Sequence, residues 1–480
     1  MRNNHNFSHE NFDVSNKRKQ NKQNHNLRQH RYTADTDHCH LQVGNNHYPI
    51  VDYSAFGIAI HIDSLLPSEA ILRGTFLYEQ EKVGSYELKL VRQDTDEQEN
   101  TVAAFEILND PINYDRVEAI RLGHSIIARQ QQYTLNLTNI PASVKAMVYE
   151  IRDWLEHLSD EVSSLQNQLS YSNESSIRQF EDTVTNMVAN YLRTSLNPKL
   201  DQFSAILQEQ PEDITQSATL FLREKLSYLI HQSPFADRVY NKPLGYAGDF
   251  EMMNLIYRQE TVGRSLFARC LQRYYIDEPA AQAVRNRADY LVSIITPLLE
   301  TQENESLDFL SVACGPAVEW QKILLKDAHW SHTVNVDLLD QDEEALRYTH
   351  TELRRLSRSV NDNINFNYKH AAIKNVIARG VQQQYDLIYS AGLFDYLSDS
   401  VAQKAAHSLY KALKPGGRLI IGNFNINNPT TLLMEYALDW ELIYRSEENL
   451  LNLYENVGDK IEIQKEPLGI NLFCVIHKNE

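Results

Sequence analysis

The sequence predicts an α/β protein whose C-terminal part is a doubly wound, mostly parallel sheet. From about residue 305 onward, short β-rich runs alternate with helical patterns, which is the rhythm of βαβ units. Before it, from about residue 140 to 232, apolar side chains recur at three- and four-residue steps, which predicts helices. Residues 31–108 alternate apolar and polar side chains with period two, which predicts a small antiparallel β-barrel.

The composition is that of a globular protein with two or three domains: 42% of the 480 residues are hydrophobic and 23% are charged. A net charge of −18 disfavours nucleic acid as a partner and favours a small molecule or a protein. No apolar run approaches the ~18 residues of a membrane span, and no hydrophobic signal core precedes the first domain. Four scattered cysteines form no CxxC pair, so we expect a cytoplasmic protein without a metal site.

Five segments follow from these patterns. Residues 1–27 contain too few apolar side chains to form a core and predict a disordered basic tail. Residues 28–130 predict the barrel with a helix over 114–129, and residues 131–235 predict a helical region. The apolar stripe of "VKAMVYEIRDWLEHLSDEVSSLQNQL" serves either as a core within one chain or as a homodimer interface. Residues 236–304 predict a helical cap or lid, and residues 305–480 predict the sheet, which ends in an antiparallel hairpin around Pro467–Gly469.

A ligand site is expected beyond the carboxyl ends of the strands. Gly315 lies where the first strand, "LDFLSVAC", turns into a helix, and glycine allows a ligand to approach the backbone. Ala317 and Trp320 stand where a GxGxxG motif would have its later glycines, so a pyrophosphate cradle is not expected. Asp340 ends the second strand, where a carboxylate can accept both hydroxyls of a ribose, and Asp342 is expected to cap the next helix.

The segments "VACGPA", "DQDEEAL", "YDLIYSAGLFDYL" and "LKPGGRLIIGNF" together resemble class I S-adenosylmethionine-dependent methyltransferases. This resemblance covers about residues 305–480 and implies a Rossmann-like sheet of seven strands with S-adenosyl-L-methionine as cofactor. It implies that residues Cys314–Ala317 lie near the methionine part, Asp340 on the ribose and residues 369–372 near the adenine. The predicted cofactor-binding residues are Cys314, Gly315, Ala317, Asp340, His370, Ser390 and Arg285.

A second resemblance rests on "GYAGD" at residues 245–249, "GLFDY" at 392–396, Asp439-Trp440 and Tyr444-Arg445. These stretches are similar to bacterial proteins that make 3-hydroxypalmitic acid methyl ester, an extracellular signalling factor. The resemblance implies carboxyl O-methylation of a 3-hydroxy fatty acid, with that acid or its thioester as the acceptor. An ionised carboxylate needs no strong base, so positioning is expected to supply most of the catalysis.

Predicted catalytic residues are Tyr246, Asp249, Tyr436 and Arg445. Arg285, Arg287 or Arg445 could pair with a carboxylate of the acceptor or of the cofactor. An amine or hydroxyl acceptor would instead require a base, for which Asp249 and His370 are candidates.

The barrel segment "IVDYSAFGIAI" contains Asp52, Ser54 and Gly57 as DxSxxG, downstream of Arg28 and Arg31, and resembles the PilZ domain. The resemblance implies a barrel that binds cyclic di-GMP through these five residues. The family spaces its arginines RxxxR, whereas Leu27 stands at the first of those positions here, which predicts weak or absent binding.

Two rival functions remain open at this point. One is a methyltransferase that acts on another small molecule or on a protein. The other is a non-catalytic protein whose partner contacts respond to cyclic di-GMP. Metabolite profiling of expressing cells discriminates between them, because only an active enzyme leaves a new methylated product.

Overall fold

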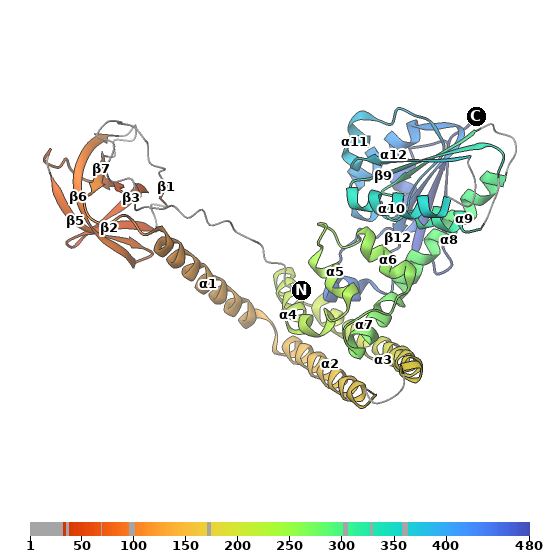
Figure 1. The fold of residues 1–480 in the computed structure, drawn as a ribbon, viewed down its shortest axis with the longest axis horizontal. Coiled ribbons are helices and arrows are strands. Elements are labelled where there is room, and N and C mark those ends of the chain that lie inside the picture. Colours follow the sequence, from red (N-terminus) through yellow and green to blue (C-terminus); the bar gives the residue numbers. More distant parts are fainter. Residues whose placement is uncertain are drawn as a thin grey trace. The chain divides into compact units, whose positions relative to one another are not determined.

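The computed structural model describes residues 32–34, 38–68, 70–95, 101–169, 174–300, 306–326, 330–357 and 363–480. The chain divides into two compact units, residues 1–136 and residues 137–480 (Figure 1). The tail predicted over residues 1–27 and the arginines Arg28 and Arg31 lie outside the described residues.

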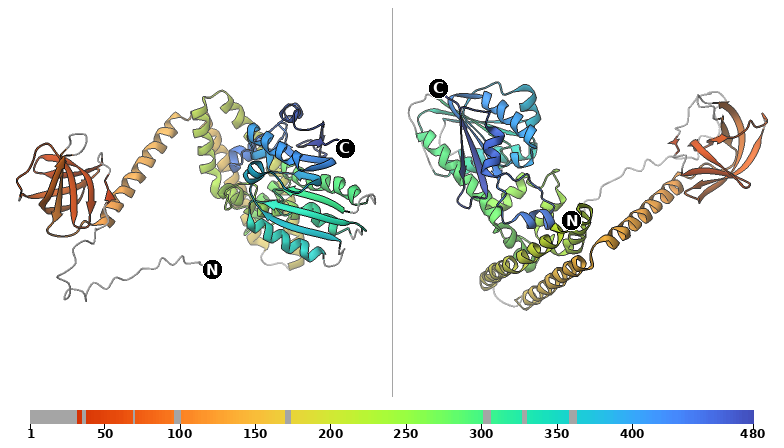
Figure 2. Two further views of the ribbon diagram at one scale, coloured as in Figure 1. Left: turned by 90° about the horizontal axis from the view of Figure 1, so that it is seen from above. Right: turned by 180° about the vertical axis from the view of Figure 1, so that it is seen from behind.

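The N-terminal unit contains a closed antiparallel barrel (Figure 2). Its strands pair in the order β3-β2-β5-β6-β7-β4, and β4 pairs again with β3. They are β2 (Cys39–Val43), β3 (Asn46–Ser54), β4 (Gly57–Ile62), β5 (Ile71–Tyr78), β6 (Glu81–Thr95) and β7 (Thr101–Ile107). The predicted small barrel is therefore confirmed, and its closure removes the free strand edges that an open sheet would expose.

The DxSxxG residues of the barrel lie at one hairpin. Asp52 and Ser54 end β3, and Ser54 pairs with Gly57 at the start of β4. The short strand β1 (Tyr32–Thr33) pairs with β3 next to them, with Tyr32 opposite Tyr53. Helix α1 (Tyr114–Asn139) follows the barrel and continues ten residues past the predicted end at 129.

The second unit begins with a helical region. Its helices are α2 (Ala142–Leu169), α3 (Glu174–Gln208), α4 (Glu212–Ile230), α5 (Pro234–Asn241), α6 (Phe250–Arg258), α7 (Leu266–Ile276) and α8 (Pro279–Glu300). The apolar stripe of α2 is buried within the chain, so it forms an intramolecular core. The same core includes residues of the cap helices and of the short π-helix η2 (Leu433–Ala437), so the predicted helical region and cap pack as one body.

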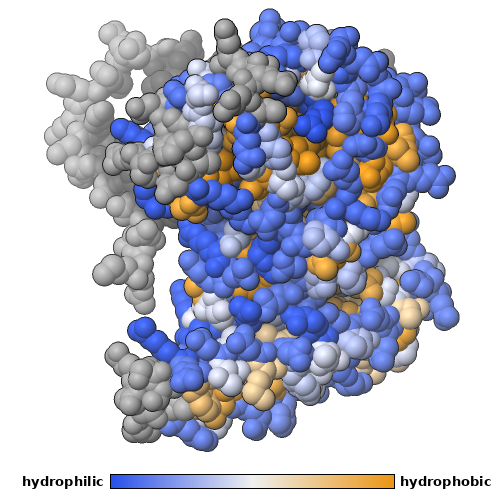
Figure 3. Space-filling model, turned by 90° about the vertical axis from the view of Figure 1, so that its right-hand side faces the viewer, coloured by the Kyte–Doolittle hydropathy of each residue, from blue (hydrophilic) through white to orange (hydrophobic). Residues whose placement is uncertain are grey.

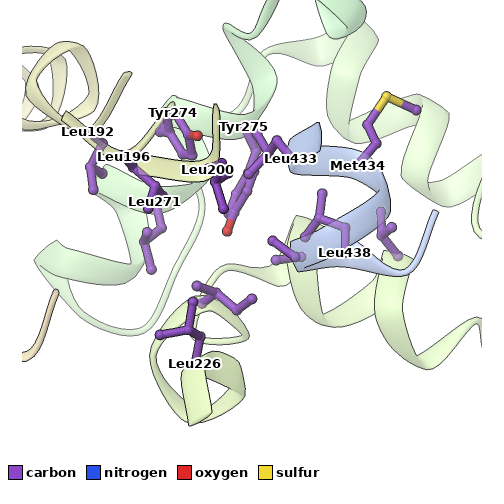
Figure 4. Close-up of a cluster of buried hydrophobic side chains, with 14 of the residues drawn as sticks. Leu192, Leu196, Leu200, Leu226, Leu271, Tyr274, Tyr275, Leu433, Met434 and Leu438 are labelled. Atoms are coloured by element: carbon purple, nitrogen blue, oxygen red, sulfur yellow. The ribbon is translucent and has the colours of Figure 1, made fainter. Parts of the chain in front are cut away.

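Figure 4 shows how η2 inserts into this helical core. Leu433, Met434 and Leu438 come from the η2 segment and lie among leucines of α3, α4 and α7 together with Tyr274 and Tyr275. A segment that follows the fifth strand of the sheet is thus built into the helical region.

The C-terminal sheet has seven strands in the order β10-β9-β8-β11-β12-β14-β13. They are β8 (Ser306–Val312), β9 (Thr333–Asp340), β10 (Ile364–His370), β11 (Tyr385–Ser390), β12 (Leu413–Phe424), β13 (Lys460–Lys465) and β14 (Asn471–His477). The first five are parallel, and β14 runs antiparallel to β12 and β13. The predicted seven-stranded sheet and its terminal hairpin at the edge are confirmed.

Helices cover both faces of this sheet, which explains why its strands read as nearly continuous apolar runs. One face packs against α8, α9 (Val318–Leu324) and α10 (Glu343–Ser357). The other packs against α11 (Ile373–Arg379), α12 (Asp399–Lys411) and α13 (Glu447–Tyr454). The strand order reverses direction around β8, so a crevice is expected beyond the carboxyl ends of β8 and its neighbours.

On the face of the molecule that Figure 3 shows, hydrophilic residues predominate and apolar residues are exposed in patches between them. Among the described residues, no helix combines the length and the apolar character that crossing a membrane requires.

Candidate active site

The first element of the site is the turn between β8 and α9. Ala313, Gly315 and Ala317 all have positive φ angles, of +54°, +50° and +46°. The amide of Cys314 donates to the carbonyl of Leu339 at 3.1 Å, which ties the turn to the end of β9. A Cβ atom built on Gly315 would meet no atom within 4 Å, so the backbone is open to a ligand at this position.

Asp340 ends β9 beside this turn and is 5% exposed. Its Oδ2 accepts the amide of Gly315 at 2.8 Å, and its Oδ1 accepts the amide of Asp342 at 2.9 Å. Burial raises the pKa of the Asp340 carboxyl group. A carboxylate has about four lone-pair sites, so these two amides leave Asp340 able to accept further hydrogen bonds from a ligand.

A cavity of about 310 Å³ opens at this place, within the ~300–1,000 Å³ range of small-molecule sites. The Gly315 turn, Asp340 and the residues after β11 form one side of it. The cap contributes side chains of α6 and α8 and the segment 242–249, which we call the wall loop. The stretch "GYAGD" belongs to the wall loop, and Tyr246 and Gly248 line the cavity.

Arg287 of α8 lines the same cavity and is 6% exposed. Its guanidinium donates to the carbonyl of Ala391 and to the sulfur of Met253, both at 3.3 Å, and its Nε has no hydrogen-bond partner. Its positive charge lowers the pKa of both Glu319 and Asp395, against the larger effect of burial, so two buried carboxyl groups lie near it. The free Nε and the place in the lining leave Arg287 able to donate to a ligand as well.

Glu319 supplies a buried carboxylate to the cavity from the first turn of α9. Its Oε1 accepts the hydroxyl of Tyr389 at 2.7 Å, and that hydroxyl oxygen accepts the indole N–H of Trp320 at 2.7 Å. Burial raises the pKa of Glu319. A carboxylate and a guanidinium thus line one cavity without an ion pair between them.

Two tyrosines of the lining, Tyr246 and Tyr396, have hydroxyl groups that can donate hydrogen bonds to a ligand. Burial raises the pKa of both Tyr246 and Tyr396, so both remain protonated at neutral pH. Of the described residues, those that line the cavity include no histidine and no lysine. The candidate general bases of this lining are therefore its two buried carboxylates, Asp340 and Glu319.

The structure brings together part of the predicted site. The predicted residues that line the cavity are Tyr246, Cys314, Gly315, Ala317 and Asp340. Asp342 caps the start of α10 as expected, because its Oδ1 accepts the amide of Glu344 at 2.8 Å. Of the three arginines considered for a carboxylate, Arg287 is the one in the lining.

Arg285 and Arg445 lie outside this lining and bind protein groups. Arg285 donates to the carbonyl of Ile276 at 2.6 Å and to the side chain of Gln282 at 2.7 Å. Arg445 pairs with Asp399 at 2.7 Å and donates to carbonyl groups of the loop before α12. Both guanidinium groups therefore hold the fold together around the site.

Tyr436 and Asp249 also lie outside the lining. The Tyr436 hydroxyl is 3.3 Å from that of Ser204 on α3, within the helical core. Asp249 is the N-cap of α6, where its Oδ1 accepts the amide of Met252 at 2.9 Å and the Nε of Arg238 at 2.7 Å. Asp249 thus fixes the helix that follows the wall loop.

His370 and Ser390 end β10 and β11, one residue before lining residues. A ring nitrogen of His370 is hydrogen-bonded to the carbonyl of Gln341 at 2.9 Å, and Ser390 donates to the carbonyl of Val312 at 2.9 Å. In the part of the chain that the structure describes, no cluster of three or more potential metal ligands is found.

Sequence reasoning assigned no role to Glu319, Tyr396 or Trp440. Glu319 follows the Gly315 turn directly, so its place in the first helical turn could have indicated it. Tyr396 lies in the quoted "GLFDY" stretch, and Trp440 donates to its hydroxyl at 2.9 Å. This last contact joins residues 44 positions apart and has no local signal in the sequence.

Residues 310–419 match the family model described as "Methyltransferase domain". A comparison with curated proteins found no match. Among solved structures, the chain is similar to a possible exported protein from Bordetella parapertussis, with 15% identity over 62% of this chain and 97% of that one and a TM-score of 0.41. A magnesium protoporphyrin IX methyltransferase from Synechocystis, with bound S-adenosylhomocysteine, shares 12% identity over 52% of this chain and 100% of that one, with a TM-score of 0.35.

The match over residues 310–419 agrees with the methyltransferase domain that the sequence motifs predict. It runs from the end of β8 to the middle of β12, and it includes the Gly315 turn and Asp340. The C-terminal part of this chain therefore contains a match to a methyltransferase domain within its seven-stranded sheet.

Proposed function

We propose that the chain is an S-adenosylmethionine-dependent carboxyl O-methyltransferase that converts a 3-hydroxy fatty acid to its methyl ester. The cavity beside Gly315 and Asp340 is its active site. The acyl acceptor comes from the sequence resemblance, and the geometry of the cavity supports a carboxylate acceptor.

The residues of the cavity fit the cofactor. The open backbone at Gly315 leaves room for a ligand, and Asp340 retains acceptor sites for ribose hydroxyls. Glu319 can accept hydrogen bonds from the ammonium group of the cofactor. When bound, S-adenosylmethionine supplies an electrophilic methyl group.

The position of Arg287 in the cavity lining is the observation on which the proposal rests. A buried guanidinium with a free Nε lines a cavity that has no histidine or lysine among its described residues. An amine or hydroxyl acceptor would have to lose a proton, whereas a carboxylate is ionised at neutral pH. The lining is therefore better suited to a carboxylate than to a group that needs a base.

The residues of this chain then have three tasks in methyl transfer. Arg287 binds and orients a carboxylate, which reduces the entropic cost of alignment. Tyr246 and Tyr396 donate hydrogen bonds while they remain protonated. Apolar side chains such as Phe250 and Leu393 exclude water and offer contact surface to an acyl chain.

Incubation of the purified chain with methyl-deuterated S-adenosylmethionine and a series of 3-hydroxy fatty acids tests the proposal. Mass spectrometry should detect a deuterated methyl ester, and Arg287→Met should lower its rate of formation on the order of a hundredfold, with partial recovery in Arg287→Lys. Deuterium in a different small molecule or in protein would overturn the choice of acceptor. No transfer to cell extract would favour the non-catalytic rival.

We also propose regulation through the barrel, which rests on the PilZ-like sequence. The pairing of β1 with β3 supports it, because the chain that follows Arg31 lies beside Asp52 and Tyr53. The DxSxxG stretch then closes the adjoining hairpin at Ser54 and Gly57.

A further inference from the structure

Trp440 lies behind the residues that line the active-site cavity and contacts one of them, Tyr396. Its indole N–H donates to the hydroxyl of Tyr396 at 2.9 Å. A Cβ atom on Gly248 would lie 2.7 Å from that hydroxyl, so a side chain at this position would displace Tyr396. Trp440 also lines a second, apolar cavity of about 20 Å³.

The residue before it, Asp439, makes the turn that directs Trp440 toward the wall. Asp439 has φ +53°, an unusual value for a residue other than glycine. The amide of Trp440 donates to the carbonyl of Met434 at 2.9 Å, which closes the end of η2. Trp440 still belongs to the helical core, and its hydrogen bond to Tyr396 joins this core to a residue that lines the active-site cavity.

Two cations from different elements hold the Asp439 carboxylate. Arg223 of α4 donates to Oδ1 at 2.5 Å, and Lys242 of the wall loop donates to Oδ2 at 2.5 Å. Arg223 is 9% exposed and also donates to the carbonyl groups of Glu435 and Tyr436. One guanidinium thus binds the carboxylate and two carbonyl groups of η2, and a fork of fixed geometry suits this task.

We infer that Asp439 is a positioning residue that, held between Arg223 and Lys242, fixes Trp440 and through it the Tyr396 side of the active-site wall. The clamp joins α4, the wall loop and the η2 segment at one carboxylate. Its importance for methyl transfer rests on the function proposed above, whereas the clamp itself can be tested without any acceptor.

Fluorine NMR of the full chain labelled with 5-fluorotryptophan is the direct test. The four tryptophans give four resonances, and Trp440→Phe identifies that of Trp440. Asp439→Gly removes the carboxylate but accepts the positive φ without strain, so a purely conformational role would leave the Trp440 resonance in place. We expect this resonance to shift or broaden in Asp439→Gly and in Arg223→Gln, while the other three stay unchanged.

The matched control is Glu181→Gln, which breaks the partly buried ion pair between Arg269 of α7 and Glu181 of α3. It should leave the Trp440 resonance unmoved. A Trp440 resonance that stays in place in both clamp variants overturns the inference, as does a shift of all four resonances, which would indicate general loss of packing.

Titration with S-adenosylhomocysteine and a methyl-transfer assay separate this inference from the proposed function. Asp439→Gly should bind S-adenosylhomocysteine as the wild type does and lose about tenfold in kcat, the scale of a misplaced reacting group. A wild-type chain that binds no S-adenosylhomocysteine would refute the proposed function and leave the NMR result valid. Unchanged kcat together with a shifted Trp440 resonance would overturn the positioning role.

Discussion

Two buried carboxyl groups near the site, Asp340 and Asp395, differ in what they bind. Asp340 lines the cavity and keeps acceptor sites for a ligand. Asp395 is 2% exposed, lies outside that lining and accepts the amide of Phe424 at 2.6 Å. Burial raises the pKa of Asp395 to about 6, so at neutral pH its charge opposes folding.

Asp395→Asn removes this unfavourable charge, so the difference in stability between Asp395→Asn and wild type should depend on pH. Between the unfolded pKa of about 3.9 and the folded value of about 6, the folded state keeps a proton that the unfolded state has lost, so wild-type stability falls as pH rises. The rise of about two units in the pKa of Asp395 corresponds to about 3 kcal/mol of folding free energy, which the wild type has lost by about pH 7. The melting temperature of Asp395→Asn relative to wild type should rise from pH 4.5 to 7 and then level off.

The control is Asp289→Asn, which changes the same charge at an exposed pair with Lys322. Its difference from wild type should be small and nearly independent of pH. Parallel melting curves for Asp395→Asn and wild type across this range would contradict the assignment.

At the scale of single residues, the sequence predicts those site residues that belong to a local sequence pattern. Gly315 and Asp340 are predictable because each ends a strand of a βαβ unit. Arg285 and Arg287 are two residues apart on α8, so they point about 200° apart around the helix. Which of them faces the cavity depends on how α8 packs, and the sequence alone does not contain that information.

The wall loop and α6 form the element that the "GYAGD" stretch builds. Asp249 caps α6 and also pairs with Arg238 of α5, so one side chain links two helices across the wall loop. The cap could be predicted from the order of residues, since aspartate precedes an apolar helical run. The ion pair could not, because it depends on the turn between α5 and α6.

Asp249→Ala should therefore cost more stability than the loss of an ordinary cap. Ser265→Ala is the reference, since Ser265 caps α7 through the amide of Ala268 at 3.0 Å and should cost about 1 kcal/mol. Asp249→Ala should exceed it by about 1–3 kcal/mol, because Arg238 loses its partner. Chemical denaturation of the full chain measures both changes, and equal losses would show that the ion pair contributes nothing.

The whole molecule combines a closed barrel with a unit in which helical region and methyltransferase sheet belong together. The sequence predicts each element of the sheet, because continuous apolar strands alternate with amphipathic helices. It does not predict that η2 joins the helical core, because the Arg223–Asp439 contact spans 216 positions. Long-range contacts of this kind depend on packing, which no local pattern records.

One prediction concerns the binding of cyclic di-GMP to the barrel. Calorimetry of the full chain should show weak or absent binding, because Leu27 occupies the position of the first arginine in the PilZ spacing. Tight binding that disappears in Arg31→Ala would mean that Arg28 and Arg31 complete the site at their present spacing.

Calorimetry with S-adenosylhomocysteine tests the central claim most directly, namely that the cavity beside Gly315 and Asp340 holds the cofactor. The wild type should bind, and Asp340→Ala should weaken binding by about 1–3 kcal/mol, because ligand hydroxyls lose a buried acceptor. Glu343→Gln removes an exposed carboxylate three residues away, one that pairs with Arg347, and should bind as the wild type does. A wild-type chain without measurable binding, or equal affinities in wild type and Asp340→Ala, would contradict the claim.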